Sequence, residues 1–156
     1  MSASPFAIRR ATPADAPIIT AHRRAMFKDM RVGKSADLDA MDAQFGPWVA
    51  DALAREIYLG WFITTAQGAI IAGAGMTIDD FPATPRDQTG RRVYVMNVYT
   101  DPQYRQRGLA RRLMQTILDW CRVNGIHSVA LQASDAGRPF YESLGFKTTN
   151  EMRLQL

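Results

Sequence analysis

Cysteine and histidine are scarce in this chain, which has one cysteine, Cys121, and two histidines, His22 and His127. A single cysteine excludes an internal disulfide and leaves any metal site without a thiolate cluster. Neither histidine lies in a group of cysteine, histidine or carboxylate residues at ligand spacing, so we expect no metal ion. Cys121 falls within an expected helix and is interpreted as core packing.

Long apolar runs are also missing, since no stretch of about 18 apolar residues occurs and no charged leader precedes an apolar segment near the start. We therefore expect a cytoplasmic protein that is neither secreted nor inserted in a membrane. No internal repeat, low-complexity tract or polar linker divides the 156 residues, 47% of which are apolar. That length suits one sizeable core. The sequence predicts a single domain over residues 1–156, with residues 1–5 as a loose end.

Positive charge is in modest excess, with 19 lysines and arginines against 15 acids and a net charge of +4. Such an excess suits nucleic acid, an anionic membrane or a phosphorylated ligand, and composition alone does not choose among them. Basic residues are concentrated between Arg91 and Arg112, where glycine and apolar residues separate them. This placement favours a local polyanion site over a nucleic-acid-binding arm, so we expect neither nucleic acid nor a membrane as partner.

The first half of the chain reads as a strand, helices and a hairpin. Thr12, Pro13 and Asp15 form a helix start, with a capping hydroxyl, a proline in the first turn and an early acid. The segment 66–68 has the length and chemistry of a hairpin turn, so the runs beside it should be antiparallel neighbours. The expected elements are a strand over 6–9, a helix over 12–30, a loop over 30–36, helical residues 38–57 with a break near Gly46, and strands over 61–65 and 69–78.

The second half alternates strands and helices. After an exposed loop expected over 79–90, a strand over 93–100 is stopped by Asp101-Pro102. Apolar residues then recur at helical spacing from Leu109 to Trp120. A strand over 128–133, a short helix over 138–144 and a terminal strand over 151–156 complete a mixed α/β fold. If the two strands beside the long helix are neighbours, they form a right-handed parallel crossover.

The segment from Tyr104 to Ala110 lies between a proline-ended strand and the start of a helix, where unpaired N–H groups face outward. Gly108 lets the backbone approach a ligand, and Arg105 and Arg107 add charge to the positive end of the helix dipole. Three or four such donors can hold a pyrophosphate, since a hydrogen bond to a charged group contributes about 1.5–3 kcal/mol. An ordinary basic helix entrance is the alternative reading of these residues alone.

Two runs together resemble a known family. The run VYVMNVYTDPQYRQRGLARRLM resembles the central strand and pyrophosphate loop of the GNAT superfamily of N-acetyltransferases, whose loop reads Arg or Gln, two residues, Gly, one residue, Gly or Ala. Arg105, Gly108 and Ala110 fill that pattern. The later run ALQASDAGRPFYESLGF resembles the family's following strand and short helix. The resemblance implies a central, mostly antiparallel sheet that is flanked by helices and splayed between two parallel strands, with acetyl-CoA in the gap as acyl donor.

The same resemblance assigns the donor-binding residues. Val98 and Thr100 occupy positions whose backbone pairs with the pantetheine arm as if it were an added strand. Ser134 stands where many members carry an asparagine that hydrogen-bonds the cofactor or the substrate side. The residues expected to bind the cofactor are Val98, Thr100, Arg105, Gln106, Arg107, Gly108, Leu109, Ala110, Ser134 and Tyr141.

Acyl transfer from a thioester to an amine needs a neutral amine, an oxyanion stabiliser and a proton for the departing thiolate. Tyr141 lies at the family's general-acid position, and the alternative is that it only packs and orients the sulfur, with its hydroxyl bound to backbone. The backbone N–H of Val98 is the candidate for polarising the thioester carbonyl. The general base is weakly marked. Its candidates are Glu56, Asp79, Asp80, and Tyr94 or Asn97 through water.

Three functions remain open at this point. The first is an N-acetyltransferase that acts on a primary amine of a small molecule, peptide or protein by direct attack in a ternary complex. The second is a non-catalytic acyl-CoA sensor, and the third is nucleic-acid binding through the arginines. Acceptor choice is expected to lie in the loop 30–36, the second helical region and the loop 79–90. Homodimerisation, common among the proteins this chain resembles, stays open as well.

Overall fold

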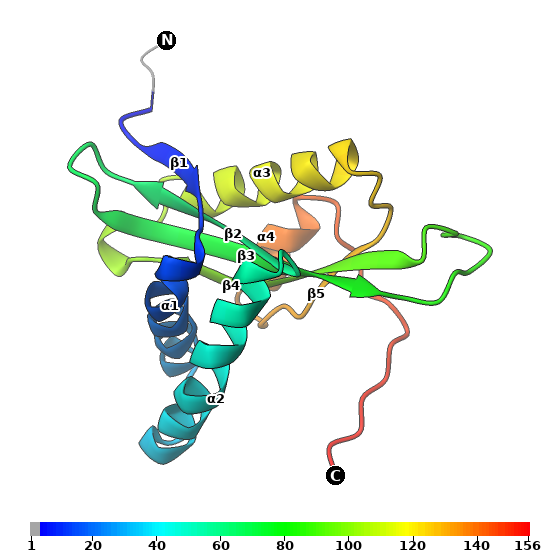
Figure 1. The fold of residues 1–156 in the computed structure, drawn as a ribbon, viewed down its shortest axis with the longest axis horizontal. Coiled ribbons are helices and arrows are strands. Elements are labelled where there is room, and N and C mark those ends of the chain that lie inside the picture. The colour runs from blue at the N-terminus through cyan, green and yellow to red at the C-terminus, as the bar shows by residue number, and fades with distance from the viewer. Residues whose placement is uncertain (1–3) are drawn as a thin grey trace.

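Five strands form the centre of the structure, a computed structural model that describes residues 4–156 (Figure 1). Neighbouring strands are antiparallel from β1 to β4, whereas β4 and β5 are parallel. The strands lie in the sheet in the order of the sequence. They are β1 (Ala7–Arg10), β2 (Tyr58–Thr64), β3 (Ile70–Asp80), β4 (Arg91–Thr100) and β5 (Val129–Leu131).

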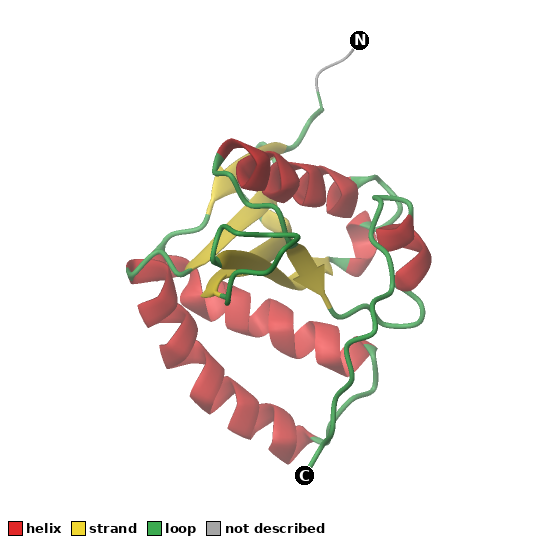
Figure 2. Cartoon of the chain, turned by 90° about the vertical axis from the view of Figure 1, so that its right-hand side faces the viewer, coloured by secondary structure: helices red, strands yellow, loops and turns green. Residues whose placement is uncertain are grey.

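Helices cover both faces of this sheet (Figure 2). The short 3-10 helix η1 (Pro13–Asp15), α1 (Ala16–Asp29) and α2 (Ser35–Ala54) lie on one side. The 3-10 helix η2 (Pro102–Tyr104) leads from β4 to α3 (Leu109–Val123), which covers the other side together with α4 (Arg138–Glu142). None of the helices in the described part of the chain has the length and apolarity needed to cross a bilayer.

Two apolar clusters, one on each face of the sheet, form the core. On the α3 side, Leu113 and Ile117 are fully buried and pack in one cluster with Met76 of β3 and Val93 of β4. On the other side, buried residues of α2 such as Val49 pack with Tyr58 and Phe62 of β2. Cys121 lies in the α3 cluster with 2% of its surface exposed, which confirms that it is a core residue.

Most of the expected elements are confirmed. β2 and β3 are antiparallel neighbours around the turn at 66–68, and the loop at 81–90 is largely exposed. α3 follows β4 directly and leads back to β5, which pairs with β4 in parallel. This confirms the expected strand, helix and strand unit, in which the apolar face of α3 packs on the sheet.

The expected break near Gly46 is wrong, because α2 runs without interruption through Gly46 and Pro47. Pro47 cannot donate the usual helical hydrogen bond, but Phe45 and Val49 on either side of it are buried against the sheet and hold both halves of the helix in place. Tertiary packing here outweighs the helix-breaking tendency of the local sequence. Gly46 also lies close to Thr20 of α1, where a Cβ would stand 3.6 Å from its hydroxyl oxygen.

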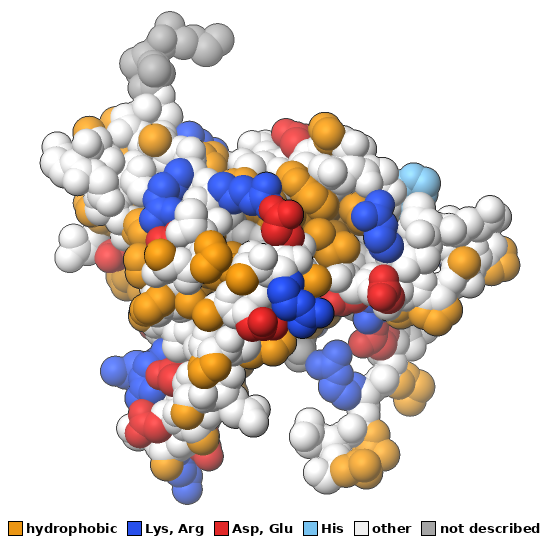
Figure 3. All heavy atoms as spheres, viewed as in Figure 1, with side chains coloured by type: hydrophobic (Ala, Val, Ile, Leu, Met, Phe, Trp, Pro, Cys, Tyr) orange, Lys and Arg blue, Asp and Glu red, His pale blue; other side chains and the backbone are white. Residues whose placement is uncertain are grey.

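The expected terminal strand over 151–156 is also wrong. Residues 147–156 form neither helix nor strand, and they extend away from the sheet to the chain end (Figure 1). Met152, Leu154 and Leu156 keep the alternation of a strand but are 94%, 80% and 108% exposed. Hydrophobic side chains are visible on this extension in the space-filling view (Figure 3). Alternation predicts a strand only where a neighbouring edge can pair with it, and the segment has none within the described chain.

Candidate active site

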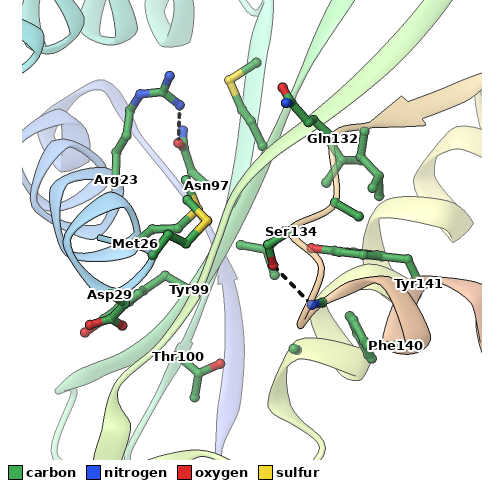
Figure 4. A pocket seen from close by; sticks show the side chains of 18 of the residues that line it. Arg23, Met26, Asp29, Asn97, Tyr99, Thr100, Gln132, Ser134, Phe140 and Tyr141 are labelled. Atoms are coloured by element: carbon green, nitrogen blue, oxygen red, sulfur yellow. Dashed lines mark hydrogen bonds between the residues drawn. The ribbon is translucent and has the colours of Figure 1, made fainter. Parts of the chain in front are cut away.

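A cleft opens where β4 and β5 diverge. The two strands pair only over Val93–Val95 and Val129–Leu131, whereas β4 continues to Thr100. From Met96 onward, the edge of β4 that faces β5 is therefore without a strand partner. The resulting cleft has a volume of about 820 Å³ and is lined by α1, β4, the loop before α3, the segment after β5 and α4 (Figure 4).

A β-bulge in β4 lies at the centre of this cleft. Met96 pairs with Gly75 and Tyr99 pairs with Gly73, so the single residue Ala74 lies opposite both Asn97 and Val98. Asn97 takes the left-handed conformation, with φ of 58°. An extra residue in one strand breaks the ladder and bends that strand. The bulge thus turns the backbone at Val98, the predicted thioester-binding position, out of the regular sheet.

The loop before α3 presents a run of free backbone donors. Six successive N–H groups, from Gln106 to Arg111, donate to no acceptor among the described residues, and the first turn of the helix is closed by Arg112 N–H bonding the Gly108 carbonyl at 3.1 Å. Gln106 and Gly108 have positive φ angles, 61° and 74°. Left-handed residues in such a loop turn successive N–H groups toward one concave side, which forms an anion site. The residues therefore fit a diphosphate group.

The arginine side chains of this loop are mostly occupied by protein contacts. Arg105 donates from Nε to the Thr100 carbonyl at 3.0 Å and pairs with Asp29 of α1 at 2.6 Å. Arg107 lies over the ring of Tyr104, 5.2 Å from its centre, and does not line the cleft. The anion site consequently depends on the backbone more than the sequence indicated. The other nine predicted cofactor-binding residues, Val98, Thr100, Arg105, Gln106, Gly108, Leu109, Ala110, Ser134 and Tyr141, all line the cleft.

Tyr141 projects from α4 into the cleft, with its hydroxyl directed toward β4 (Figure 4). Its ring packs against Phe140 and Phe146, with ring centres 5.0 and 6.0 Å away. The hydroxyl makes no hydrogen bond to any described residue, and burial raises the pKa of this phenol above its ordinary value. Tyr141 therefore keeps its proton at physiological pH. Nearby, Ser134 Oγ accepts a hydrogen bond of 3.1 Å from the Gly137 N–H and so caps the turn that leads into α4.

The carboxylates suspected as bases are not brought to the cleft. Glu56 follows α2, is exposed, and pairs with Arg10 at 3.2 Å. Asp79 and Asp80 lie at the far end of β3, opposite Arg92 and Arg91 of β4. Tyr94 and Asn97 do line the cleft, and Asp29 is the sole carboxylate among its described lining residues. No cluster of metal-ligating side chains occurs in residues 4–156.

Several lining residues were missed by the sequence analysis, because they come from α1. Arg23, Met26 and Phe27 line the cleft from this helix. Arg23 meets Asn97 across 74 positions of the sequence, a separation at which no local motif gives a signal. Of the segments expected to select the acceptor, the loop 30–36 contributes Met30 and Val32, whereas α2 and the loop 79–90 contribute none of the described lining residues.

His22 is partly buried on α1, next to the cleft. Its ring stands 4.8 Å from that of Tyr99, a lining residue, and 5.9 Å from that of Phe62. Burial lowers the pKa of His22 to about 4, although the charge of Asp101 opposes the shift. His22 is therefore neutral at physiological pH and acts as a packing residue.

Comparison with known proteins gives consistent matches. A model of the acetyltransferase (GNAT) family matches residues 23–146. A curated relative, glucosamine 6-phosphate N-acetyltransferase of Trypanosoma brucei brucei, is 34% identical over 98 residues, and the match covers 61% of this chain and 63% of the relative. This chain thus spans less than two thirds of that relative's length.

Solved structures match over nearly the whole chain. A GCN5-related N-acetyltransferase from Ralstonia eutropha JMP134 has a TM-score of 0.90 and 30% identity, covering 97% of this chain and 98% of that one. A predicted acetyltransferase from Clostridium acetobutylicum, determined with acetyl-CoA, has a TM-score of 0.86 and 29% identity, with coverage of 97% and 95%. This chain thus shares its overall fold with these proteins.

Proposed function

The chain belongs to the acetyltransferase (GNAT) family, and from this premise we propose that it transfers an acetyl group from acetyl-CoA to a primary amine while both are bound. The main support is the run of six free N–H groups from Gln106 to Arg111, placed at the end of a cleft between diverging strands. This arrangement suits a long ligand with a diphosphate at one end. The presence of acetyl-CoA in the similar Clostridium structure supports the same donor.

The backbone of β4 is proposed to bind the donor and to stabilise its reacting carbonyl. The bound acetyl-CoA supplies the activated acetyl group as a thioester. Val98 and Thr100 offer backbone groups to the pantetheine arm along the free edge of β4, and the Val98 N–H is proposed to bond the carbonyl oxygen that gains charge. Removal of one such donor typically costs about 10²–10³ in rate.

Tyr141 is proposed to provide the proton for the departing thiolate. Its hydroxyl is in the cleft and has no competing hydrogen bond among the described residues. An ordinary phenol has a pKa of about 10 and a thiol about 8.5, so the transfer costs roughly 2 kcal/mol, and the raised pKa of Tyr141 adds to that cost. The cost would be lower if the proton lost by the attacking amine reached the Tyr141 hydroxyl, either directly or through a water. A proton taken up by Tyr141 as it gives its own away keeps the phenol neutral throughout.

The acceptor is proposed to be an amine that is already partly neutral. No free carboxylate faces the described cleft, because Asp29 is paired with Arg105. Neutralising a lysine amine at pH 7 costs about 4.6 kcal/mol, whereas an amine with a pKa near 7.7 costs only about 1 kcal/mol. The name of the trypanosomal relative gives an amino sugar as its acceptor, which supports a primary amine as the acceptor class here.

Binding of the donor is tested by thermal unfolding. Acetyl-CoA at 100 times its dissociation constant stabilises a protein by about 2.7 kcal/mol, which should raise the melting temperature by roughly 5–11 °C at this chain length. Thiol release in the presence of a panel of amines then tests transfer. A melting shift without transfer to any amine would favour the sensor function, and no shift at millimolar acetyl-CoA would contradict the proposal altogether.

The role of Tyr141 is tested by Tyr141→Phe, which removes only the hydroxyl. We expect the turnover number to fall by about 100-fold, because general-acid catalysis contributes on this scale. The melting shift with acetyl-CoA should stay near that of the wild type. Unchanged turnover would show that Tyr141 merely packs against the donor.

A further inference from the structure

Arg23 is a charged side chain of the cleft that the proposed transfer chemistry does not use. Its guanidinium carbon stands 5.0 Å from the ring centre of Phe27 and 4.8 Å from that of Phe45. Nη1 donates a hydrogen bond of 2.8 Å to Asn97 Oδ1, as Figure 4 shows. Within the described chain, Arg23 makes no ion pair and no other hydrogen bond, and its buried Nε has no partner.

Two other arginines, Arg24 and Arg9, contrast with Arg23. Arg24, the next residue of α1, pairs with Asp42 at 2.7 Å and with Asp39 at 2.9 Å. Arg9 forms two hydrogen bonds with the buried Asp15, at 2.8 and 2.9 Å. A cation that leaves water without a counterion loses solvation that nothing replaces. Burial accordingly lowers the pKa of Arg23, opposed only by the phenols of Tyr58 and Tyr94.

The position of the Arg23 guanidinium is fixed from behind. Asn97 Nδ2 donates to the hydroxyl of the buried Tyr58 at 3.1 Å, which leaves Asn97 Oδ1 facing Arg23. Gly75 makes room for this tyrosine, since a Cβ there would lie 1.9 Å from the Tyr58 hydroxyl oxygen. The hydrogen bonds that run from Tyr58 of β2 through Asn97 of the β4 bulge to Arg23 of α1 therefore hold one edge of the guanidinium. Nη2 makes no hydrogen bond within the described chain and keeps some exposed surface, on a residue that lines the cleft.

We propose that Arg23 binds an oxyanion, a carboxylate or a phosphate, carried by the same molecule that presents the acceptor amine. The inference rests on the proposed N-acetyltransferase activity and names the class of its acceptor. Arginine pairs with either oxyanion through charge-assisted hydrogen bonds. Because Asn97 is adjacent to Val98 in β4, the oxyanion lies near the reacting carbonyl. The acceptor is thus a small anionic amine, with few bonds between its two groups.

The wild-type protein tests this with matched pairs of amines. One pair is an amino acid and its carboxamide, and the other is an aminoalkyl phosphate and the amino alcohol. Thiol release gives kcat/KM for each, at equal concentrations of neutral amine so that differences in amine pKa do not enter. We expect the anionic member of at least one pair to be preferred by about tenfold or more, and the better pair identifies carboxylate or phosphate.

Variants then locate the preference. Arg23→Met should reduce kcat/KM for the anionic amine by about tenfold or more and change that for the neutral partner by less than about threefold. Arg23→Lys keeps the charge without the forked geometry and should retain part of the preference. Arg24→Met is the matched control on the next position of the same helix and should leave the preference intact. The melting shift with acetyl-CoA shows that each variant is folded and still binds the donor.

The outcomes separate this inference from the proposed function. If acetyl-CoA raises the melting temperature and charged and neutral amines are acetylated equally well, Arg23 is not an anion site and the transferase activity stands. The same holds if Arg23→Met keeps the full preference. If no amine is acetylated, the proposed function fails. The role of Arg23 is then tested by calorimetry, which measures the affinity of the aminoalkyl phosphate and of the amino acid in the presence of CoA. Affinity for the better ligand should then fall by about tenfold in Arg23→Met, and equal affinity would overturn the inference.

Discussion

The two ends of the cleft differ in the groups they offer: one offers backbone N–H groups and the other offers side chains. At the proposed donor end, the backbone N–H groups of six consecutive residues, Gln106 to Arg111, make no hydrogen bond within the described chain. At the proposed acceptor end, the side chains of Tyr58, Asn97 and Arg23 come from β2, β4 and α1 and form a chain of hydrogen bonds. A backbone site tolerates changes of side chain but depends on φ and ψ, whereas a side-chain site depends on residue identity and packing. Substitutions at the two ends should therefore fail in different ways.

The largest effect on stability is expected from Gly75→Ala, which disturbs the packing around Tyr58 behind the proposed acceptor end. The new Cβ would stand 1.9 Å from the Tyr58 hydroxyl oxygen, so Tyr58 must move and release Asn97. Overpacking of this kind costs about 3 kcal/mol, or roughly 6–12 °C in melting temperature. Gly46→Ala in α2 is the control, since its Cβ would make only an ordinary contact, 3.6 Å from the Thr20 hydroxyl oxygen of α1, and its melting temperature should not fall. Equal melting temperatures for the two variants would show that Tyr58 is not tightly held.

A second effect concerns pH and the partly buried His22. Its pKa is about 4 in the folded protein, below the ordinary 6.5, so the unfolded chain binds a proton first as the pH falls. Stability from neutral His22 is complete above about pH 6.5 and is lost as the pH falls toward 4, by about 2 kcal/mol at pH 5. Denaturant unfolding at pH 8 and pH 5 measures this loss.

The variant His22→Gln should flatten that loss between pH 8 and pH 5. Asp15 does not interfere, because Arg9 lowers the pKa of its carboxyl from 3.8 to about 2 and its contribution is lost only below about pH 4. A pH dependence that persists unchanged in His22→Gln would mean that another group titrates in this window.

At the donor end, Gly108→Val should weaken acetyl-CoA binding by about 5- to 30-fold. Valine at φ of 74° costs about 1–2 kcal/mol, so the loop relaxes and its N–H groups no longer converge. Gly125→Val is the matched control, because Gly125 has φ of 68°, lies in similarly open space and is outside the cleft. Both variants should lose similar stability, and only the first should bind acetyl-CoA more weakly by titration calorimetry.

The smallest effect is expected from Arg107→Ala. This side chain lies over Tyr104 and outside the cleft, so its removal should change acetyl-CoA affinity by less than about threefold at physiological salt. A loss comparable to that of Gly108→Val would mean that the donor end depends on side-chain charge after all, and the contrast between the two ends would disappear.

The same contrast explains what could be predicted from the sequence. The donor loop is contiguous, and its glycine and its place before an amphipathic helix are visible in the residues themselves. The hairpin between β2 and β3 is likewise local. The contact between Arg23 and Asn97 spans 74 positions, and the bulge that carries Asn97 depends on how β3 pairs with β4. The terminal strand failed for a related reason, because alternation in 151–156 does not supply a neighbouring strand.

The bulge in β4 also makes this strand sensitive to its length. Loss of one residue at Asn97 or Val98 would leave a single residue opposite Ala74 and restore a regular ladder, in which Met96 and Tyr99 keep their partners Gly75 and Gly73. The left-handed turn at Asn97 and the bent backbone at Val98 would be lost with the extra residue. A deletion of one residue there would therefore remove the bent edge of the cleft while the strand pairing on either side of it stays intact.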